Sequence, residues 1–177
     1  MRFYDIFNGD ADGLCALHQL RLAEPCDATL ITGVKRDIAL LARVAPQPGD
    51  ELTVLDVSLD TNREALLGAL RSGARVRYFD HHFAGEIPRH DLLEAHIDTS
   101  ATVCTSLIVD RHLGGRHRAW AIVAAFGDNL RAQAYCAAGA LGLKPADVET
   151  LRELGECLNY NAYGASIADL HFHPAQL

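Results

Sequence analysis

The chain has 177 residues, the size of one domain, and 49% of them are hydrophobic, which is enough to bury a sizeable core. Its formal net charge of −7 argues against a broad nucleic-acid surface, although bound divalent cations would still admit a short anionic substrate. The amino terminus lacks a secretory signal and no apolar run reaches the ~20 residues that cross a bilayer, so we expect a soluble, cytoplasmic protein. The five cysteines are scattered without a C-x-x-C pair, which argues against a disulfide framework and a zinc knuckle.

Short apolar runs alternate with helical patterns along the first part of the chain. Strands are predicted at residues 3–7, 28–32, 52–55 and 76–79, which are brief and partly β-branched or aromatic. Helices are predicted at residues 13–23, 37–44 and 62–72 and then, from residue 101 onward, at 101–113, 120–126, 129–141 and 145–159. This alternation predicts an α/β fold, a Rossmann-like parallel sheet flanked by helices, with a helical carboxyl-terminal part.

No internal repeat or convincing linker divides the chain, so residues 1–177 are expected to form a single domain. Within it we distinguish a core at residues 1–130, a helical extension at 131–160 and a tail at 161–177. His171 and His173 stand two apart in this tail, as metal ligands can, but a solvated or disordered tail is the preferred interpretation.

Acidic residues follow almost every predicted strand. They are Asp10 and Asp12 after the first strand, Asp56 after the third, Asp80 with His81 and His82 after the fourth, and Asp128 after the apolar stretch 121–126. Because ligands bind at the carboxyl ends of parallel strands, these groups are expected to converge at one edge of the sheet.

Taken singly, each acidic residue also has a structural interpretation, as a helix cap or a turn residue. Taken together, uncompensated carboxylates at one edge would repel one another, and a bound cation is the simplest remedy. Several carboxylates with one or two imidazoles suit Mn²⁺, Mg²⁺ or Co²⁺ better than a thiolate-bound zinc. Carboxylates that bridge can hold two ions ~3.5–4 Å apart, the arrangement used for displacement at phosphorus.

The order of these motifs resembles that of the DHH phosphoesterases. Residues 8–13 (NGDADG) resemble the first motif of the family, residues 54–58 (VLDVS) the second, and residues 80–82 (DHH) the motif that names it. The Ser/Thr-rich residues 98–106 and residues 127–129 (GDN) match the remaining pattern, so the resemblance extends to about Leu130.

The resemblance implies a hydrolase that attacks a phosphodiester, phosphomonoester or phosphoanhydride with a metal-activated water. Asp56 would bridge two metal ions, with Asp10 holding the first. The ligands of the second ion would be Asp12, His81 and Asp128. The resemblance favours Mn²⁺, with Mg²⁺ or Co²⁺ as alternatives.

Further residues take roles in the same picture. Asp80 would orient an imidazole, and His82 would contact a phosphoryl oxygen. Asn8, Ser100 and Thr102 are candidates for substrate binding, although Ser100 and Thr102 could equally cap the helix that follows them. The expected partner is a small phosphorylated substrate or a short oligonucleotide, with no membrane partner, and the sequence indicates no oligomeric state.

Lys35 and Arg36, which follow the second strand, could meet a substrate phosphate or form a plain surface pair.

Two features depart from the family pattern. Ile6 stands where the family places a metal-binding histidine, so the first ion is expected to bind weakly unless Asn8, water or substrate fills the gap. Nothing after Leu130 resembles the usual second, substrate-binding domain, so either the protein works with one domain or the chain is a fragment of a longer protein. Ile6 supports one alternative function, a catalytically weakened relative that binds a nucleotide or a protein partner. A different enzyme on the same sheet, such as an acyl transferase that uses Cys104 or a histidine, is supported only by the permissiveness of the fold.

Overall fold

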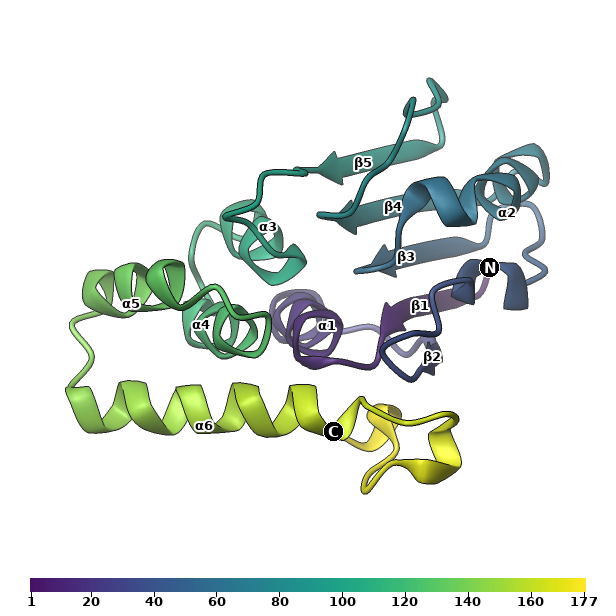
Figure 1. Cartoon of the computed structure of the whole chain (residues 1–177). Helices are drawn as coiled ribbons and strands as arrows, with labels where there is room; N and C mark the ends of the chain where they lie inside the picture. The colour runs from purple at the N-terminus through teal and green to yellow at the C-terminus, as the bar shows by residue number, and fades with distance from the viewer.

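The computed structural model describes all 177 residues, and its centre is a five-stranded sheet (Figure 1). The strands are β1 (Phe3–Asn8), β2 (Thr29–Gly33), β3 (Glu51–Leu55), β4 (Arg75–Asp80) and β5 (Leu93–Ile97). Their spatial order is β2-β1-β3-β4-β5, and every neighbouring pair is parallel. In this order the direction of winding reverses between β1 and β3, so the exits of these two strands form the crevice where such sheets bind ligands.

Helices cover both faces of the sheet, which confirms the predicted fold class. They are α1 (Ala11–Ala23), α2 (Leu59–Arg71), α3 (Thr105–His112), α4 (Arg118–Gly127), α5 (Arg131–Ala140) and α6 (Pro145–Asn161). Helix α2 lies on one face, α1 and α3 lie on the other, and α4, α5 and α6 form a further layer beside α1 (Figure 1). None of these helices combines the length and the apolar character that a membrane span requires.

The period-2 alternation of the strands produces a separate apolar cluster on each face of the sheet. Tyr4 and Ile6 of β1 point to the face covered by α2, where they join Val54, Tyr78 and Leu66. On the other face, Phe7, Leu55 and Phe79 pack against α1 and α3. A third cluster, which includes Ile122 and Val148, holds the layer of α4, α5 and α6 together.

Two predictions of secondary structure were wrong. Residues 37–44 do not form an α-helix and contain only the 3₁₀ turn η1 (Leu40–Arg43). The Asn62 side chain accepts a hydrogen bond from the Leu41 backbone N–H (3.2 Å) and donates one to the Ile38 carbonyl (2.7 Å), and these bonds replace part of a helical ladder. Strand β5 was missed because its sequence, LEAHI, is half polar and forms a half-buried edge strand.

The tail at residues 161–177 is folded, and of the two alternatives given for it, solvated or disordered, the structure agrees with the first. It contains the 3₁₀ turns η2 (Ile167–Asp169) and η3 (Pro174–Gln176). The Asn161 amide exchanges two hydrogen bonds with the Phe172 backbone, at 2.9 and 3.0 Å, and Pro174 is buried against Gly9. A Cβ atom at Gly9 would lie 2.1 Å from the Gly33 carbonyl oxygen, so only glycine fits where the tail and the exits of β1 and β2 meet. His171 and His173 themselves are exposed.

Candidate metal centre

The first acidic motif forms the junction between β1 and α1. Asp10 is the N-cap of α1, and its Oδ1 accepts hydrogen bonds from the backbone N–H groups of Asp12 (3.0 Å) and Gly13 (3.2 Å). A Cβ atom at Gly13 would lie 2.1 Å from the Asn8 carbonyl oxygen, so the tight turn requires glycine there. The junction therefore fixes both carboxylates directly at the exit of β1.

Asp12 is held by the amino terminus of α3. Its Oδ2 accepts a hydrogen bond from the Thr105 N–H and its Oδ1 one from the Ser106 N–H, both at 2.7 Å. The first N–H groups of a helix have no partner within the helix and favour a negative charge, so this contact is strong. This contact also explains why α3 begins at Thr105, whereas the helix was predicted to begin at residue 101.

Asp56 is buried at the exit of β3 with a φ of 59°, in the left-handed region. The Thr105 hydroxyl donates a hydrogen bond to its Oδ1 at 3.1 Å. Asn129, which follows Asp128, has a φ of 61°, and these two are the chain's non-glycine residues with positive φ. Such backbone conformations cost of order 1–3 kcal/mol and concentrate at functional sites. Thr105 and Ser106 were missed as site residues, and their only signal was the Ser/Thr-rich segment at residues 98–106.

His81 lies among three of the predicted carboxylates. Its Nε2 atom is 3.5 Å from Asp56 Oδ1, 3.8 Å from Asp128 Oδ2 and 3.9 Å from Asp12 Oδ2. Asp12, His81 and Asp128 each offer one ligand atom within 4.8 Å of the others, as do Asp56, His81 and His82. We call Asp10, Asp12, Asp56 and Asp128, together with His81, the carboxylate cluster. Five residues from four separate chain segments thus converge at one edge of the sheet.

Asp10 differs from the other members because Lys35 neutralises it. The Lys35 ammonium donates a hydrogen bond to Asp10 Oδ2 and another to Asn159 Oδ1 (3.0 Å), and it lies 3.8 Å from Asp128 Oδ1. The Asn8 amide does not fill this place, because it bonds the Lys35 carbonyl (2.9 Å) and the Asp10 N–H (3.1 Å). Ile6 lies fully buried in the apolar cluster on the α2 face.

The directions of the pKa shifts also separate Asp10 from Asp56 and Asp128. Burial raises the pKa of Asp56, and the nearby charges of Asp12 and Asp10 raise it further. The pKa of Asp128 is raised by burial and by the same two carboxylates. Burial would also raise the pKa of Asp10, but the attraction of Lys35 and its hydrogen bond outweigh it, and the net shift is downward. Negative charge is therefore left uncompensated around Asp56 and Asp128.

Asp80 orients His82 rather than His81. The His82 Nδ1–H donates a hydrogen bond to Asp80 Oδ1 at 2.7 Å, and this bond raises the pKa of His82. The other carboxylate oxygen of Asp80, Oδ2, is buried without a hydrogen-bond partner. Because the His82 ring remains about half exposed, its Nε2 edge is accessible from solvent.

Ser100, Thr102 and Cys104 lie between β5 and α3. Ser100 and Thr102 are exposed, and the Ser100 hydroxyl donates to Asp98 at 2.6 Å. Their role in substrate binding stays a prediction. Cys104 is buried, and burial together with the Asp12 charge raises the pKa of its thiol, so it is a poor nucleophile. Of the two nucleophiles considered for the acyl-transferase alternative, Cys104 or a histidine, the cysteine is therefore disfavoured.

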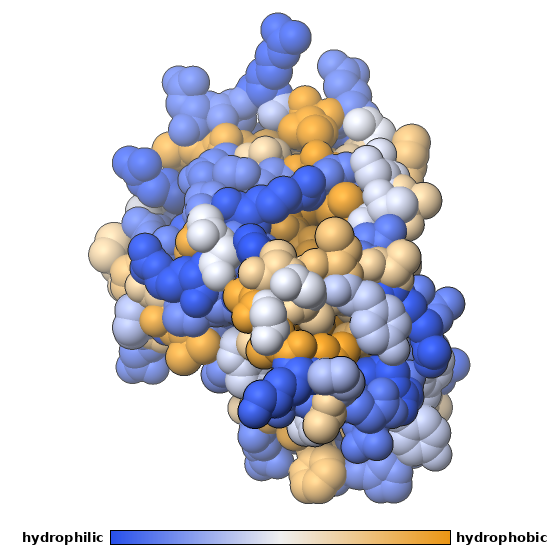
Figure 2. All heavy atoms as spheres, turned by 90° about the vertical axis from the view of Figure 1, so that its left-hand side faces the viewer, coloured by the Kyte–Doolittle hydropathy of each residue, from blue (hydrophilic) through white to orange (hydrophobic).

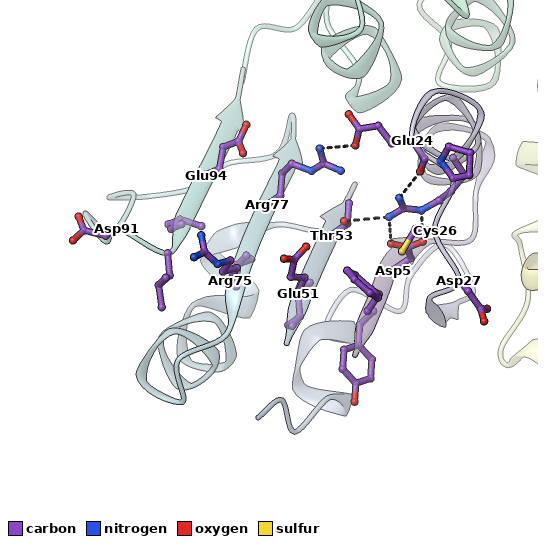
Figure 3. A pocket seen from close by; sticks show the side chains of 18 residues that line it. Asp5, Glu24, Cys26, Asp27, Glu51, Thr53, Arg75, Arg77, Asp91 and Glu94 are labelled. Carbon is purple, nitrogen blue, oxygen red and sulfur yellow. Dashed lines mark hydrogen bonds and ion pairs between the residues drawn. The ribbon is translucent and has the colours of Figure 1, made fainter. Parts of the chain in front are cut away.

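The carboxyl ends of β3, β4 and β5 point to the left in Figure 1, toward the side shown in Figure 2. This face is mostly hydrophilic and is interrupted by smaller apolar patches (Figure 2). A hollow of about 690 Å³ lies at the opposite end of the strands, and none of the predicted site residues lines it (Figure 3). We call it the amino-end pocket; its floor is the cross-strand row Asp5, Thr53, Arg77 and Glu94.

The chain is thus an α/β domain with a candidate metal centre at the switch point of its sheet. No protein-family model and no curated protein sequence matches it. Among solved structures, a DHH-domain protein described as a member of the s1p family of ribosomal proteins aligns over 91% of this chain with a TM-score of 0.65 and 13% sequence identity. An exonuclease RecJ bound to manganese aligns over 92% with a TM-score of 0.52 and 20% identity.

These similarities show that the chain has the fold of a DHH domain, as its motifs predicted. The alignments cover 47% and 49% of the two solved chains, so this chain spans about half of their length.

Proposed function

We propose that the protein is a metal-dependent phosphoesterase of the DHH type that hydrolyses a phosphodiester, phosphomonoester or phosphoanhydride. The observation that carries this proposal is the position of His81 Nε2, within 3.5–3.9 Å of carboxylate oxygens of Asp12, Asp56 and Asp128. At these distances the His81 imidazole makes no strong hydrogen bond to the carboxylates around it. The gap between them is one that a cation would close.

The donor set fits a hard divalent ion. Three carboxylates and an imidazole suit Mn²⁺, Mg²⁺ or Co²⁺, and the raised pKa values of Asp56 and Asp128 indicate negative charge that such an ion would neutralise. When bound, the ion would polarise a phosphoryl oxygen and lower the pKa of a water molecule.

The chain's own residues would prepare this chemistry by fixing the ligands. The amino terminus of α3 holds Asp12, and the Thr105 hydroxyl holds Asp56. Ligands positioned in this way need no reorganisation when substrate arrives. His82, whose protonated form is favoured by its hydrogen bond to Asp80, would donate a hydrogen bond to a phosphoryl oxygen and offset developing negative charge.

The choice of ion rests on a structural neighbour, and the choice of substrate class rests on the net charge of the chain. The RecJ structure is described as an exonuclease bound to manganese, which favours Mn²⁺ as the ion to test first. A net charge of −7 favours a small phosphorylated molecule or a short oligonucleotide over a long nucleic acid. We further propose that residues 1–177 fold as one domain.

The proposal is tested by an activity screen over phosphorylated small molecules and short oligonucleotides. The screen uses Mn²⁺, Mg²⁺, Co²⁺ or EDTA, and the Asp56→Asn variant is the matched control. Hydrolysis that requires a divalent ion and is lost in Asp56→Asn is expected. Hydrolysis that persists in EDTA would contradict the proposal.

A second candidate is a relative that binds a phosphorylated ligand or a partner without turnover. The observation that favours it is the first ligand position, where Ile6 is part of the apolar core and Lys35 takes the Asp10 carboxylate. This candidate predicts metal-dependent ligand binding by calorimetry with no product over the whole panel.

A further inference from the structure

Lys35 is held in place by its backbone as well as by its side chain. Its N–H donates to the Ala162 carbonyl at 3.0 Å, and its carbonyl accepts from the Asn8 amide at 2.9 Å. The segment that follows α6 and the end of β1 therefore both position it. The side chain is about 30% exposed, whereas its partner Asp10 is buried.

The Lys35 ammonium saturates the oxygens on its side of the carboxylate cluster. Asp10 Oδ1 already accepts two backbone N–H groups, and Asp10 Oδ2 accepts from Lys35. Asn159 Oδ1, a further oxygen that could ligate an ion, also accepts from Lys35. An ammonium has three donors, no acceptor and a positive charge, so it cannot act as a ligand and repels a metal ion from the oxygens that it contacts.

Asp128 lies between two cation positions. Its Oδ1 is 3.8 Å from the Lys35 ammonium, and its Oδ2 is 3.8 Å from His81 Nε2. Within the carboxylate cluster, the groups with metal-ligand geometry all contain His81, and none of them includes Asp10. One side of the cluster thus has a cation built into the chain, and the other side has ligands without one.

We propose that Lys35 is the fixed cation of this centre, occupying the place beside Asp10 so that the protein binds a single divalent ion, at Asp12, Asp56, His81 and Asp128. This inference rests on the proposed metal centre and adds that the first cation is an ammonium. The attraction of Asp10 keeps the Lys35 charge in place, since it raises the pKa of Lys35 although burial acts in the opposite direction.

The number of bound ions tests this inference. The full chain and its variants are titrated with MnCl₂ by calorimetry, and free Mn²⁺ is followed by its paramagnetic resonance signal. We expect one ion in the wild-type protein and two in Lys35→Met, because that change frees oxygens of Asp10 and Asn159. Lys35→Arg keeps the charge and Arg36→Met removes a neighbouring exposed charge, so each is expected to bind one ion.

A second measurement does not depend on counting. In EDTA, Lys35→Met is expected to melt at a lower temperature than the wild-type protein, and Mn²⁺ is expected to raise its Tm by more. Lys35→Gln, which retains a hydrogen-bonding group, replaces Lys35→Met if the latter does not fold.

The outcomes separate this inference from the proposed function. Two ions in the wild-type protein, or a single ion in folded Lys35→Met or Lys35→Gln, would overturn the role of Lys35 and leave the metal centre intact. No bound ion in any of these proteins would instead reject the metal centre, and the inference with it.

Discussion

The two ends of the sheet differ in how the charges of their buried acidic residues are compensated. In the amino-end pocket, buried Asp5 receives two hydrogen bonds from the Arg21 guanidinium, at 2.5 and 2.7 Å, and Arg77 pairs with Glu24 at 2.9 Å (Figure 3). In the carboxylate cluster, only Asp10 accepts a hydrogen bond from a lysine or arginine side chain, and Asp128 lies 3.8 Å from the same Lys35 ammonium. The buried carboxylate Asp5 in the amino-end pocket is thus neutralised by the chain itself, whereas Asp56 in the carboxylate cluster is not.

The difference teaches that charge compensation indicates function here better than the volume of a pocket does. A carboxylate that a neighbouring arginine neutralises is paired within the fold and carries no uncompensated charge that would attract a cation. Carboxylates without neighbouring cations repel one another, and a bound ion would relieve this repulsion, so the proposed function places ion binding at the exits of β1, β3 and β4.

The largest expected effect comes from removing a central ligand. Asp56→Asn keeps the shape of the side chain but removes the carboxylate nearest to His81, so we expect loss of Mn²⁺ binding on the His81 side. Groups that only support metal ligands cost up to ~100-fold in activity when they are changed, so the loss of a ligand itself should lower hydrolysis by more than ~100-fold. Steady-state assays and calorimetry measure both. Asp91→Asn, an exposed change of the same chemistry, is the control, and equal activity in the two variants would contradict the role of Asp56.

The next largest effect is expected at the opposite end of the sheet. Arg21→Met leaves the buried Asp5 carboxylate without a partner, which costs about 3–5 kcal/mol of unfolding free energy. Mn²⁺ stabilises any folded variant that binds it, so the difference in unfolding free energy between Arg21→Met and the wild-type protein should be the same with and without Mn²⁺. Urea denaturation under both conditions measures this difference, and Arg77→Met, which breaks a more exposed pair, should cost about 1 kcal/mol or less. A difference that disappears in saturating Mn²⁺ would show that the two ends of the sheet are not independent.

A smaller effect is expected where α3 supports the cluster. Thr105→Val removes the hydroxyl that donates to Asp56 but keeps the volume, and the loss of one such hydrogen bond, about 1.5 kcal/mol, corresponds to a roughly tenfold lower kcat/KM. Thr61→Val, at an exposed threonine in the first turn of α2, should leave activity unchanged. If Thr105→Val is as active as the wild-type protein, the hydroxyl does not position Asp56.

The smallest effect concerns pH. The raised pKa values of Asp56 and Asp128 mean that the metal-free folded state binds protons more tightly than the unfolded state, so their destabilisation is relieved as pH falls toward the unfolded pKa of about 3.9. The raised pKa of His82 acts in the same direction, since its stabilisation is lost as pH rises through the folded pKa.

Urea denaturation in EDTA should therefore give a higher unfolding free energy at pH 5 than at pH 7 from these groups. Mn²⁺ should reverse the slope, because its ligands must be deprotonated to bind it. The pKa of Asp98, outside the cluster, is shifted in the opposite direction, because hydrogen bonds with Ser100 and Arg111 lower it to about 2. Its ionised form therefore stabilises the folded state, and this stabilisation is lost only in strong acid. The same pH dependence with and without Mn²⁺ would contradict the account.

The sequence predicted the sheet and the convergence of acidic residues because both depend on local patterns. Short apolar runs mark strands β1 to β4, and the rule that strand exits share an edge predicts that Asp12, Asp56 and Asp128 lie near His81, as they do. Strand β5 could not be predicted in the same way, since this half-buried edge strand has no such apolar run.

The contacts that depend on tertiary structure were beyond the sequence. Lys35 was weighed only as a phosphate contact or a surface residue, and nothing local indicates that its ammonium would reach both Asp10 and Asn159, 124 positions away. Asp80 was expected to orient an imidazole, but the choice of His82 depends on how the loop after β4 turns. The contact of the α3 amino terminus with Asp12 likewise joins residues 93 positions apart.

The most direct test of the central claim, that the uncompensated end of the sheet is a metal centre, is a crystal structure of the protein with Mn²⁺ and diffraction data collected at the manganese absorption edge. The account predicts one anomalous peak among Asp12, Asp56, His81 and Asp128, with the Lys35 ammonium still beside Asp10. A cluster without a peak, or a peak only at the exposed group of Glu94, His96 and His112, would contradict it.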